Sequence, residues 1–282
     1  MRLINMRELT LKEQQAFALD ILKDVHQFCD KENIRYSLAY GTLIGALRHQ
    51  GFIPWDNDID ICMPRPDYER FLKTYKSNQF ELAFFGKGCK YDSLIAYARV
   101  FDNKKTVAKN GHWIAQPAGI WIDVFPLDGV PDDFDEFKTL YNNLHDDWEK
   151  IIAKKIQFRR ISHCSGIKEA LKLLYHKIRK RNGLGGHKMQ KAYNEKIARI
   201  PFETAHFYSQ LAVMDNGPVE HLPVDSYKDR ILLDFAGAKF YAIKDYDPAL
   251  RAVYGDYMQL PPEEDRVPHQ SFIKFYWKDG VN

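Results

Sequence analysis

Asp58 and Asp60 have the spacing of a metal-binding carboxylate pair. They lie in Asp58–Met63 (DIDICM), where polar and apolar residues alternate as in a β-strand. Side chains two apart in a strand share a face, and their Cα atoms are about 6.5 Å apart, so both carboxylates could bind the same divalent cation. Asp56 extends this row if the preceding loop does not turn it away. The spacing predicts a site for divalent cations.

A third carboxylate, Asp123, lies in the apolar segment GIWIDVFPL, which also reads as a strand. A lone aspartate between Trp121 and Phe125 is costly to bury unless it has a partner. That partner could be a metal shared with Asp58 and Asp60, a proton that it accepts beside such a metal, or simply an arginine.

Gly41 and Thr42 open a predicted helix just before the aspartate row. Glycine permits close approach of a ligand to the backbone, and a helix N-terminus presents unpaired N–H groups to an anion such as phosphate. A phosphate site beside a carboxylate pair is the layout of metal-assisted phosphoryl transfer. Each feature alone has a simpler interpretation, because Asp-x-Asp is often a solvated strand edge and Gly-Thr often only a helix cap.

The elements that must position these residues alternate along the first 130 residues. Thr10 and Glu13 have the capping-box spacing, and an apolar stripe predicts a helix from there to about Cys29. Expected strands are Arg35–Ala39, Asp58–Met63, Phe80–Phe85, Leu94–Phe101, Thr106–Lys109 and Gly119–Leu127, with helices from Gly41 to Leu47 and from about Pro66. This order favours an α+β fold.

The pattern becomes mainly helical after residue 132. Helices are expected at Asp133–Phe158, Gly166–Arg181 and His187–Arg199, followed by a helix around Phe207–Met214 and a strand pair within Arg230–Ile243.

Three long runs of the chain resemble the LicD family, bacterial phosphorylcholine transferases related to fukutin and fukutin-related protein. They are YSLAYGTLIGALRHQGFIPWDNDIDICM, IWIDVFPLDG and YDPALRAVYGDYMQLPPEEDRVPH. The resemblance implies a nucleotidyltransferase-like fold, a short mixed β-sheet flanked by helices. Since residues 131–226 carry no family signature, we expect a catalytic core at 1–130, a basic helical segment at 131–226 and a C-terminal family block at 227–282 that packs on the core.

The resemblance also implies roles for individual residues. Asp58, Asp60 and Asp123 would hold Mg²⁺, or Mn²⁺, and Asp123 would help hold the metal or accept the proton of the acceptor hydroxyl. Gly41 and Thr42 stand where related enzymes have a Gly-Ser phosphate contact. Further candidates to bind substrate and stabilise the departing charge are Arg48, Arg266 and His269.

The implied reaction moves phosphocholine, or a similar phosphoalcohol, from CDP-choline or another CDP-alcohol to a sugar hydroxyl. The acceptor would be a lipid-linked precursor of teichoic acid or of another cell-surface glycan. A choline cage needs aromatic or acidic groups, for which Trp113, Trp121, Tyr241 and Tyr246 are candidates. The alternatives are a true nucleotidyltransferase that attaches a nucleotide to its target, and a catalytically idle glycan- or nucleotide-binding module.

Charge is divided unevenly along the chain. The formal net charge is +3, but residues 150–199 carry fifteen Lys and Arg against two Glu, which leaves −10 for the rest. A basic amphipathic helix here could contact an anionic membrane surface, or pack on the core with a solvated basic face. Nucleic acid is disfavoured, because few aromatic residues are interspersed.

Composition excludes other classes of protein. The longest stretch without charge, Asn110–Ile122, has 13 residues, whereas a spanning helix needs about 20. The charged N-terminus does not resemble a signal peptide, which predicts a cytoplasmic protein. Peripheral binding at the inner face of the plasma membrane is a further expectation. The four cysteines lie far apart, so neither disulfides nor a zinc cluster are indicated.

Overall fold

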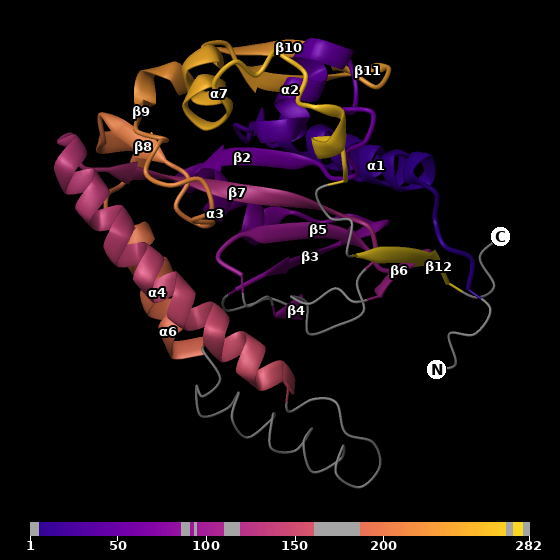
Figure 1. Cartoon of the computed structure of the whole chain (residues 1–282), viewed down its shortest axis with the longest axis horizontal. Coiled ribbons are helices and arrows are strands. Elements are labelled where there is room, and N and C mark those ends of the chain that lie inside the picture. Colours follow the sequence, from indigo (N-terminus) through magenta and orange to yellow (C-terminus); the bar gives the residue numbers. More distant parts are fainter. Residues whose placement is uncertain are drawn as a thin grey trace, which may run out of the picture.

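In the computed structural model, the chain folds around one central mixed β-sheet (Figure 1). The structure describes residues 6–85, 91–92, 95–109, 119–160, 187–268 and 273–278. The predicted helix Gly166–Arg181 and the candidates Trp113 and His269 lie outside these described residues.

The central sheet has the strand order β1-β2-β7-β5-β3-β4, with β8 and β9 joined to the far end of β7. In this order the strands span Ser37–Leu38, Asp60–Pro64, Trp121–Val130, Ala98–Asp102, Phe80–Phe84, Tyr91–Asp92, Phe207–Ser209 and Leu222–Pro223. β2 and β7 run parallel, whereas β5 is antiparallel to both β7 and β3. The prediction of an α+β fold with a short mixed sheet is confirmed.

Helices lie against this sheet and around its edge at β1 and β2. They are α1 (Leu11–Lys31), α2 (Tyr40–His49), α3 (Arg65–Thr74), α4 (Phe134–Arg160), α6 (His187–Ile197) and α7 (Asp247–Tyr254). The remaining elements are the strand pairs β10 (Arg230–Phe235) with β11 (Ala238–Ile243) and β12 (Lys274–Trp277) with β6 (Thr106–Lys109), and the 3₁₀ turns η1 (Phe202–Thr204), η2 (Val224–Tyr227) and η3 (Glu263–Asp265). Figure 1 shows α2, α7 and the β10–β11 hairpin gathered beside β2.

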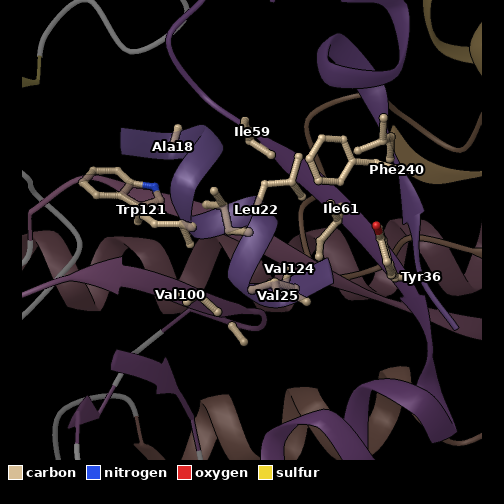
Figure 2. Packing of buried hydrophobic residues seen from close by; sticks show 14 of the residues in the cluster. Ala18, Leu22, Val25, Tyr36, Ile59, Ile61, Val100, Trp121, Val124 and Phe240 are labelled. Atoms are coloured by element: carbon tan, nitrogen blue, oxygen red, sulfur yellow. The ribbon is translucent and has the colours of Figure 1, made fainter. Parts of the chain in front are cut away.

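The main core forms between α1 and the sheet. Thr10 and Glu13 make the predicted capping box, which satisfies N–H groups that would otherwise lack partners at the helix start. Leu22 and Val25 of α1 are fully buried against Ile61 of β2 and Val124 of β7 (Figure 2). All ten residues of β7 are buried, so this strand is the centre of the fold.

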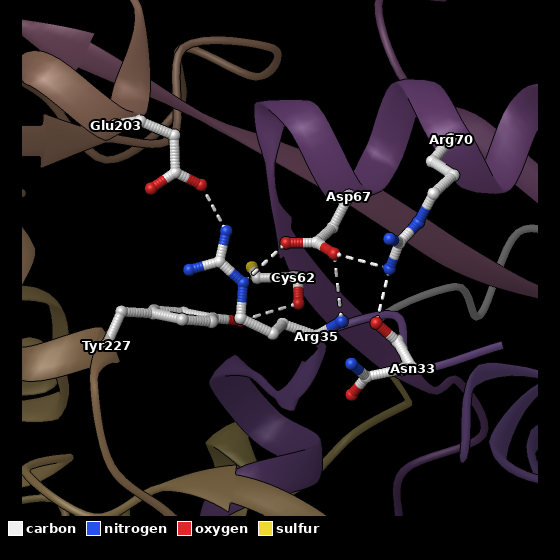
Figure 3. Close-up of polar contacts among 7 residues, drawn as sticks. All are labelled: Asn33, Arg35, Cys62, Asp67, Arg70, Glu203 and Tyr227. Atoms are coloured by element: carbon white, nitrogen blue, oxygen red, sulfur yellow. Dashed lines mark hydrogen bonds and ion pairs between the residues drawn. The ribbon is translucent and has the colours of Figure 1, made fainter. Parts of the chain in front are cut away.

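A charged network ties the α3 N-terminus to distant segments (Figure 3). Asp67 accepts hydrogen bonds from the Nε of Arg35 at 2.6 Å and from Arg70 at 3.1 Å. Arg35 also pairs with Glu203 of η1. The Tyr227 hydroxyl donates to the carbonyl oxygen of Cys62 at 2.7 Å. These contacts hold residues of the C-terminal half against α3 and β2.

The β10–β11 hairpin closes through a two-residue turn. Ala236 and Gly237 both have positive φ angles, 50° and 81°, as a type I′ turn requires. The Ala236 N–H donates to the carbonyl oxygen of Gln50 at 2.8 Å, which attaches the hairpin to the end of α2. The predicted strand pair within Arg230–Ile243 is therefore confirmed, and it supports the helix that carries Gly41.

Two predictions of secondary structure are wrong. The segment Phe207–Met214, expected as a helix, forms strand β8 at Phe207–Ser209 and then a turn, because hydrogen bonds to β7 replace the helical ones. Strand β2 begins at Asp60, so Asp58 lies in the preceding loop and not in a strand with Asp60. Helix α7 was not expected at all. The subdivision at residues 130 and 226 stays a prediction.

Candidate functional site

A cavity of about 880 Å³ opens beside the start of β2. Its walls come from α2, the loop before β2, Phe125 of β7, the turn at 210–216 and the C-terminal segment 254–268. Asp56, Asp58 and Asp60 all line it. The loop before β2 therefore places the three aspartates in one cavity, although only Asp60 belongs to a strand.

The pKa of Asp60 is strongly perturbed. Burial raises its pKa well above the ordinary value, and the negative charges of Asp58, Asp123 and Asp56 raise it further, against a smaller opposing effect of Arg99. Burial likewise raises the pKa of Asp56, although hydrogen bonds with Asp58 and the Asn57 N–H oppose this. Crowded carboxylates of this kind are stabilised by a bound cation.

Asp123 lies behind Asp60, opposite it in the parallel β2–β7 register. It is 5% exposed and is paired with Arg99, whose Nε donates to one carboxylate oxygen at 2.5 Å. The Arg99 guanidinium also stacks over Trp121 at 4.5 Å and donates to the Tyr97 hydroxyl at 3.0 Å. Of the partners considered for Asp123, the one present in the structure is an arginine, Arg99. Asp123 itself does not line the cavity.

The Thr42 hydroxyl makes a structural hydrogen bond. The buried side chain accepts a hydrogen bond from the Asp60 N–H at 2.9 Å, which couples the start of α2 to the start of β2. Gly41 lines the cavity. Since no side chain caps the N-terminus of α2, its first-turn N–H groups lie where an anion can approach. Gly41 lies on the cavity wall as a candidate phosphate contact, whereas the buried Thr42 does not line the cavity and its contact with phosphate stays a prediction.

Replacement of Gly41 by alanine is expected to lower activity without unfolding the protein. A Cβ atom there would lie 3.0 Å from Oδ2 of Asp56, so this carboxylate must shift by a few tenths of an ångström. Because small misplacements at a reacting centre are costly, we expect a loss of about tenfold or more in kcat. Steady-state kinetics and urea unfolding check this, and an unchanged kcat contradicts it.

The predicted substrate-binding arginines hold the rim of the cavity. Nη1 of Arg48 donates to the carbonyl oxygens of Tyr257 at 2.9 Å and Gln259 at 3.1 Å, and the residue lines the cavity. Arg266 donates to the carbonyl oxygen of Pro261 at 3.0 Å and lies 5.7 Å above the Trp55 ring. Both arginines thus hold the segment that follows α7 in place.

Sequence reasoning missed several residues of the cavity wall. Tyr40, Phe125 and Tyr254 line it, whereas Trp121, Tyr241 and Tyr246, proposed for a choline cage, do not. Trp121 is buried beneath Arg99 and against Phe275. Tyr241, which lies in β11, donates a hydrogen bond from its hydroxyl to Asp30 of α1. All three stand inside the resembling runs, so their place in those runs was the available signal.

The basic segment 150–199 is described only at its two ends, and the predicted amphipathic helix within it, residues 167–178, lies outside the described residues. At the described C-terminal end, Tyr193 and Ile197 of α6 are buried with Phe137 and Tyr141 of α4, so α6 itself packs on a core. Within the described residues, no helix is both long and apolar enough to cross a lipid bilayer.

The carboxylates fit a metal ion that is shared with a substrate. Across the described part of the chain, no three or more Asp, Glu, His or Cys side chains form a ready-made metal centre. Mg²⁺, however, is commonly bound by one or two carboxylates and completes its shell with water and substrate phosphates. Asp58 and Asp60, both in the cavity, supply such a pair.

Comparison with known proteins identifies the family. A model described as "LicD/FKTN/FKRP, nucleotidyltransferase domain" matches residues 33–151, which include α2, the aspartate row and β7. The chain is 33% identical over 275 residues to the lipopolysaccharide cholinephosphotransferase LicD of Haemophilus influenzae, covering 94% of this chain and 97% of that protein. The chain belongs to the LicD family. The predicted family and enzyme class, a LicD-like phosphotransferase, are confirmed.

Two further relatives are similar over shorter stretches. An uncharacterized protein of Rickettsia typhi is 37% identical over 75 residues, and one of Rickettsia prowazekii is 40% identical over 63 residues. They cover only 25% and 22% of this LicD-family chain, so the Haemophilus protein is the more informative relative.

Proposed function

We propose that this LicD-family protein transfers phosphocholine, or a similar phosphoalcohol, from a CDP-linked donor to a sugar hydroxyl of a cell-surface glycan. The observation that carries the proposal is the cavity in which Asp56, Asp58 and Asp60 meet the N-terminus of α2. A diphosphate and a divalent cation complement this combination of carboxylates and helix N–H groups. The name of the Haemophilus relative supports choline phosphate as the transferred group.

Mg²⁺, or Mn²⁺ in its place, is the metal that we propose for Asp58 and Asp60. When bound, it would neutralise the diphosphate and polarise the phosphorus that is attacked. Asp123 is proposed to act from behind Asp60, where its pairing with Arg99 keeps a further negative charge compensated beside the metal site.

The protein's own residues position the reacting groups. Gly41 allows the diphosphate to approach the start of α2, and the Thr42 hydroxyl holds Asp60 through its backbone N–H. The acceptor oxygen forms a bond to the phosphorus that bears the alcohol, the bond from that phosphorus to CMP breaks, and a carboxylate of the cavity accepts the hydroxyl proton. Arg48 and Arg266 keep the C-terminal rim in place around the substrates.

The acceptor and the place of action are further parts of the proposal. A precursor of lipopolysaccharide, teichoic acid or another surface glycan, linked to a lipid, would be met at the inner face of the plasma membrane. Since a nucleotide-linked donor is a cytoplasmic metabolite, we propose a cytoplasmic enzyme that can bind this surface peripherally. His269 and the basic segment stay candidates for contacts with these substrates.

Release of CMP tests the proposed function directly. Wild-type protein with CDP-choline, Mg²⁺ and a glycan acceptor is expected to release CMP, Asp58→Ala to release essentially none, and the surface control Asp234→Ala to match wild type. No CMP release, together with no effect of Asp58→Ala, would refute the proposal. Pyrophosphate release from a nucleoside triphosphate would instead favour a true nucleotidyltransferase. Ligand binding that is unchanged by EDTA, with no turnover of any CDP-alcohol, would favour an idle binding module.

A further inference from the structure

One part of the cavity wall is aromatic. Tyr40 and Phe125 meet edge to face with ring centroids 5.9 Å apart, and Tyr97 packs behind Phe125 at 4.6 Å. Tyr254, the last residue of α7, also lines the cavity and remains 44% exposed. Three elements that are distant in sequence, α2, β7 and α7, thus contribute aromatic rings to one space.

A carboxylate adjoins these rings without a cation of its own. The Tyr40 hydroxyl donates to both oxygens of Glu220, at 3.1 and 3.3 Å. Within the described residues, no Lys, Arg or His forms an ion pair with Glu220. Among the described residues, the groups whose pKa its charge raises include the neutral side chains Tyr40, Cys62, Tyr141, Tyr208 and Tyr254. Burial raises the pKa of Glu220 to about 7, against the opposing hydrogen bond from Tyr40.

The backbone of Tyr40 is held in a conformation that aromatic residues rarely adopt. Its φ angle is +49°, in the left-handed region that favours glycine. Such strain persists where the surrounding structure demands it, often at binding sites. Here the strained residue is the one that both lines the cavity and bonds Glu220, so the strain places the ring and the hydroxyl for a ligand.

We propose that the cavity-lining rings of Tyr40, Phe125 and Tyr254 bind the quaternary ammonium group of the donor, and that Glu220, which lies outside the cavity wall at the Tyr40 hydroxyl, supplies the negative charge of this cage. A quaternary ammonium ion offers no hydrogen-bond donor, so it is recognised by aromatic faces and by an unpaired negative charge. The inference rests on the proposed function, because it assigns the choline end of the same donor.

The cage adjoins the carboxylates that face the diphosphate. Tyr254 lines the same cavity as Asp58 and Asp60, and its pKa is raised by burial first and then by the charges of Asp60 and Glu220. One donor molecule can therefore place its phosphates by the aspartate row and its ammonium group by the aromatic rings.

Donor selectivity tests the cage. We expect Glu220→Gln to raise the KM for CDP-choline about tenfold or more, with KM for the uncharged donor CDP-glycerol changed less than about twofold. Tyr254→Leu should act in the same direction, whereas Tyr254→Phe retains the ring and should stay close to wild type. Glu203→Gln is the matched control, since this glutamate pairs with Arg35 away from the cavity.

A binding measurement separates failure of the cage from failure of the proposed function. With EDTA present, phosphocholine should raise the unfolding temperature of wild type more than phosphoethanolamine does, and this difference should vanish in Glu220→Gln. If wild type turns over CDP-choline but Glu220→Gln and Tyr254→Leu retain its KM and selectivity, the cage is wrong and the function stands. If no CDP-alcohol is turned over, yet the phosphocholine shift still depends on Glu220, the function fails and the cage stands.

Discussion

Asp60→Asn is expected to reduce transfer by at least about 10²–10³-fold while raising stability at neutral pH. The activity is lost because one of two proposed metal ligands becomes a weak one, a deficit of about 3–4 kcal/mol in transition-state stabilisation. The stability rises because the folded-state pKa of Asp60 lies well above its unfolded value. The contribution of Asp60 to the free energy of unfolding is therefore fully present at acid pH and is lost as pH rises through the folded-state pKa. Asparagine does not titrate, so the variant does not lose stability in this way.

Thermal unfolding in EDTA, at pH 4 and pH 8, measures this effect without metal binding. The variant should match wild type at pH 4 and unfold at a higher temperature at pH 8. The matched control is Asp102→Asn, since Asp102 is 2% exposed and accepts the N–H groups of Lys104 and Thr106 outside the cavity. That control should lose stability and keep its activity per folded molecule. An Asp60→Asn variant that is active, or destabilised at pH 8, contradicts the assignment.

Asp128→Ala is expected to destabilise the protein by about 3–5 kcal/mol, the cost of leaving a buried charge without its partner. The fully buried Asp128 of β7 accepts two hydrogen bonds from Arg65, at 2.7 and 2.6 Å. This pair joins the start of α3 to β7, directly after the strand that begins with Asp60.

Urea unfolding of a double-mutant cycle isolates the pair. The variant Arg65→Met with Asp128→Leu removes both charges and should recover most of the stability that either single change loses. Additive losses would show that the two side chains act independently. A cost below about 1 kcal/mol for Asp128→Ala would place the pair among weak surface interactions.

These two aspartates illustrate opposite uses of a buried carboxylate. Burial raises the pKa of both, but Asp128 is paired with an arginine, whereas Asp60 lies among other acids that disfavour its charge further. Tyr40, whose φ angle is positive, also lines the cavity. Strain of this kind at a site is typical of function and not of scaffold.

Local patterns in the sequence were sufficient for much of the fold. The capping box at Thr10, the β6 strand at Thr106–Lys109 and the β10–β11 hairpin follow from neighbouring residues, because caps, alternation and turns depend on short-range chemistry. The helix expected at Phe207–Met214 failed because pairing with β7 outweighed local propensity.

The sequence by itself determined the family and the aspartate row, since both are written in contiguous residues. Only the tertiary structure decided which partners those residues have. Arg99 of β5 is paired with Asp123 of β7, and the Thr42 hydroxyl accepts a hydrogen bond from the Asp60 N–H. Glu220 accepts a hydrogen bond from Tyr40, 180 positions earlier in the chain. Such contacts depend on sheet register and on the packing of distant segments, which no local spacing encodes.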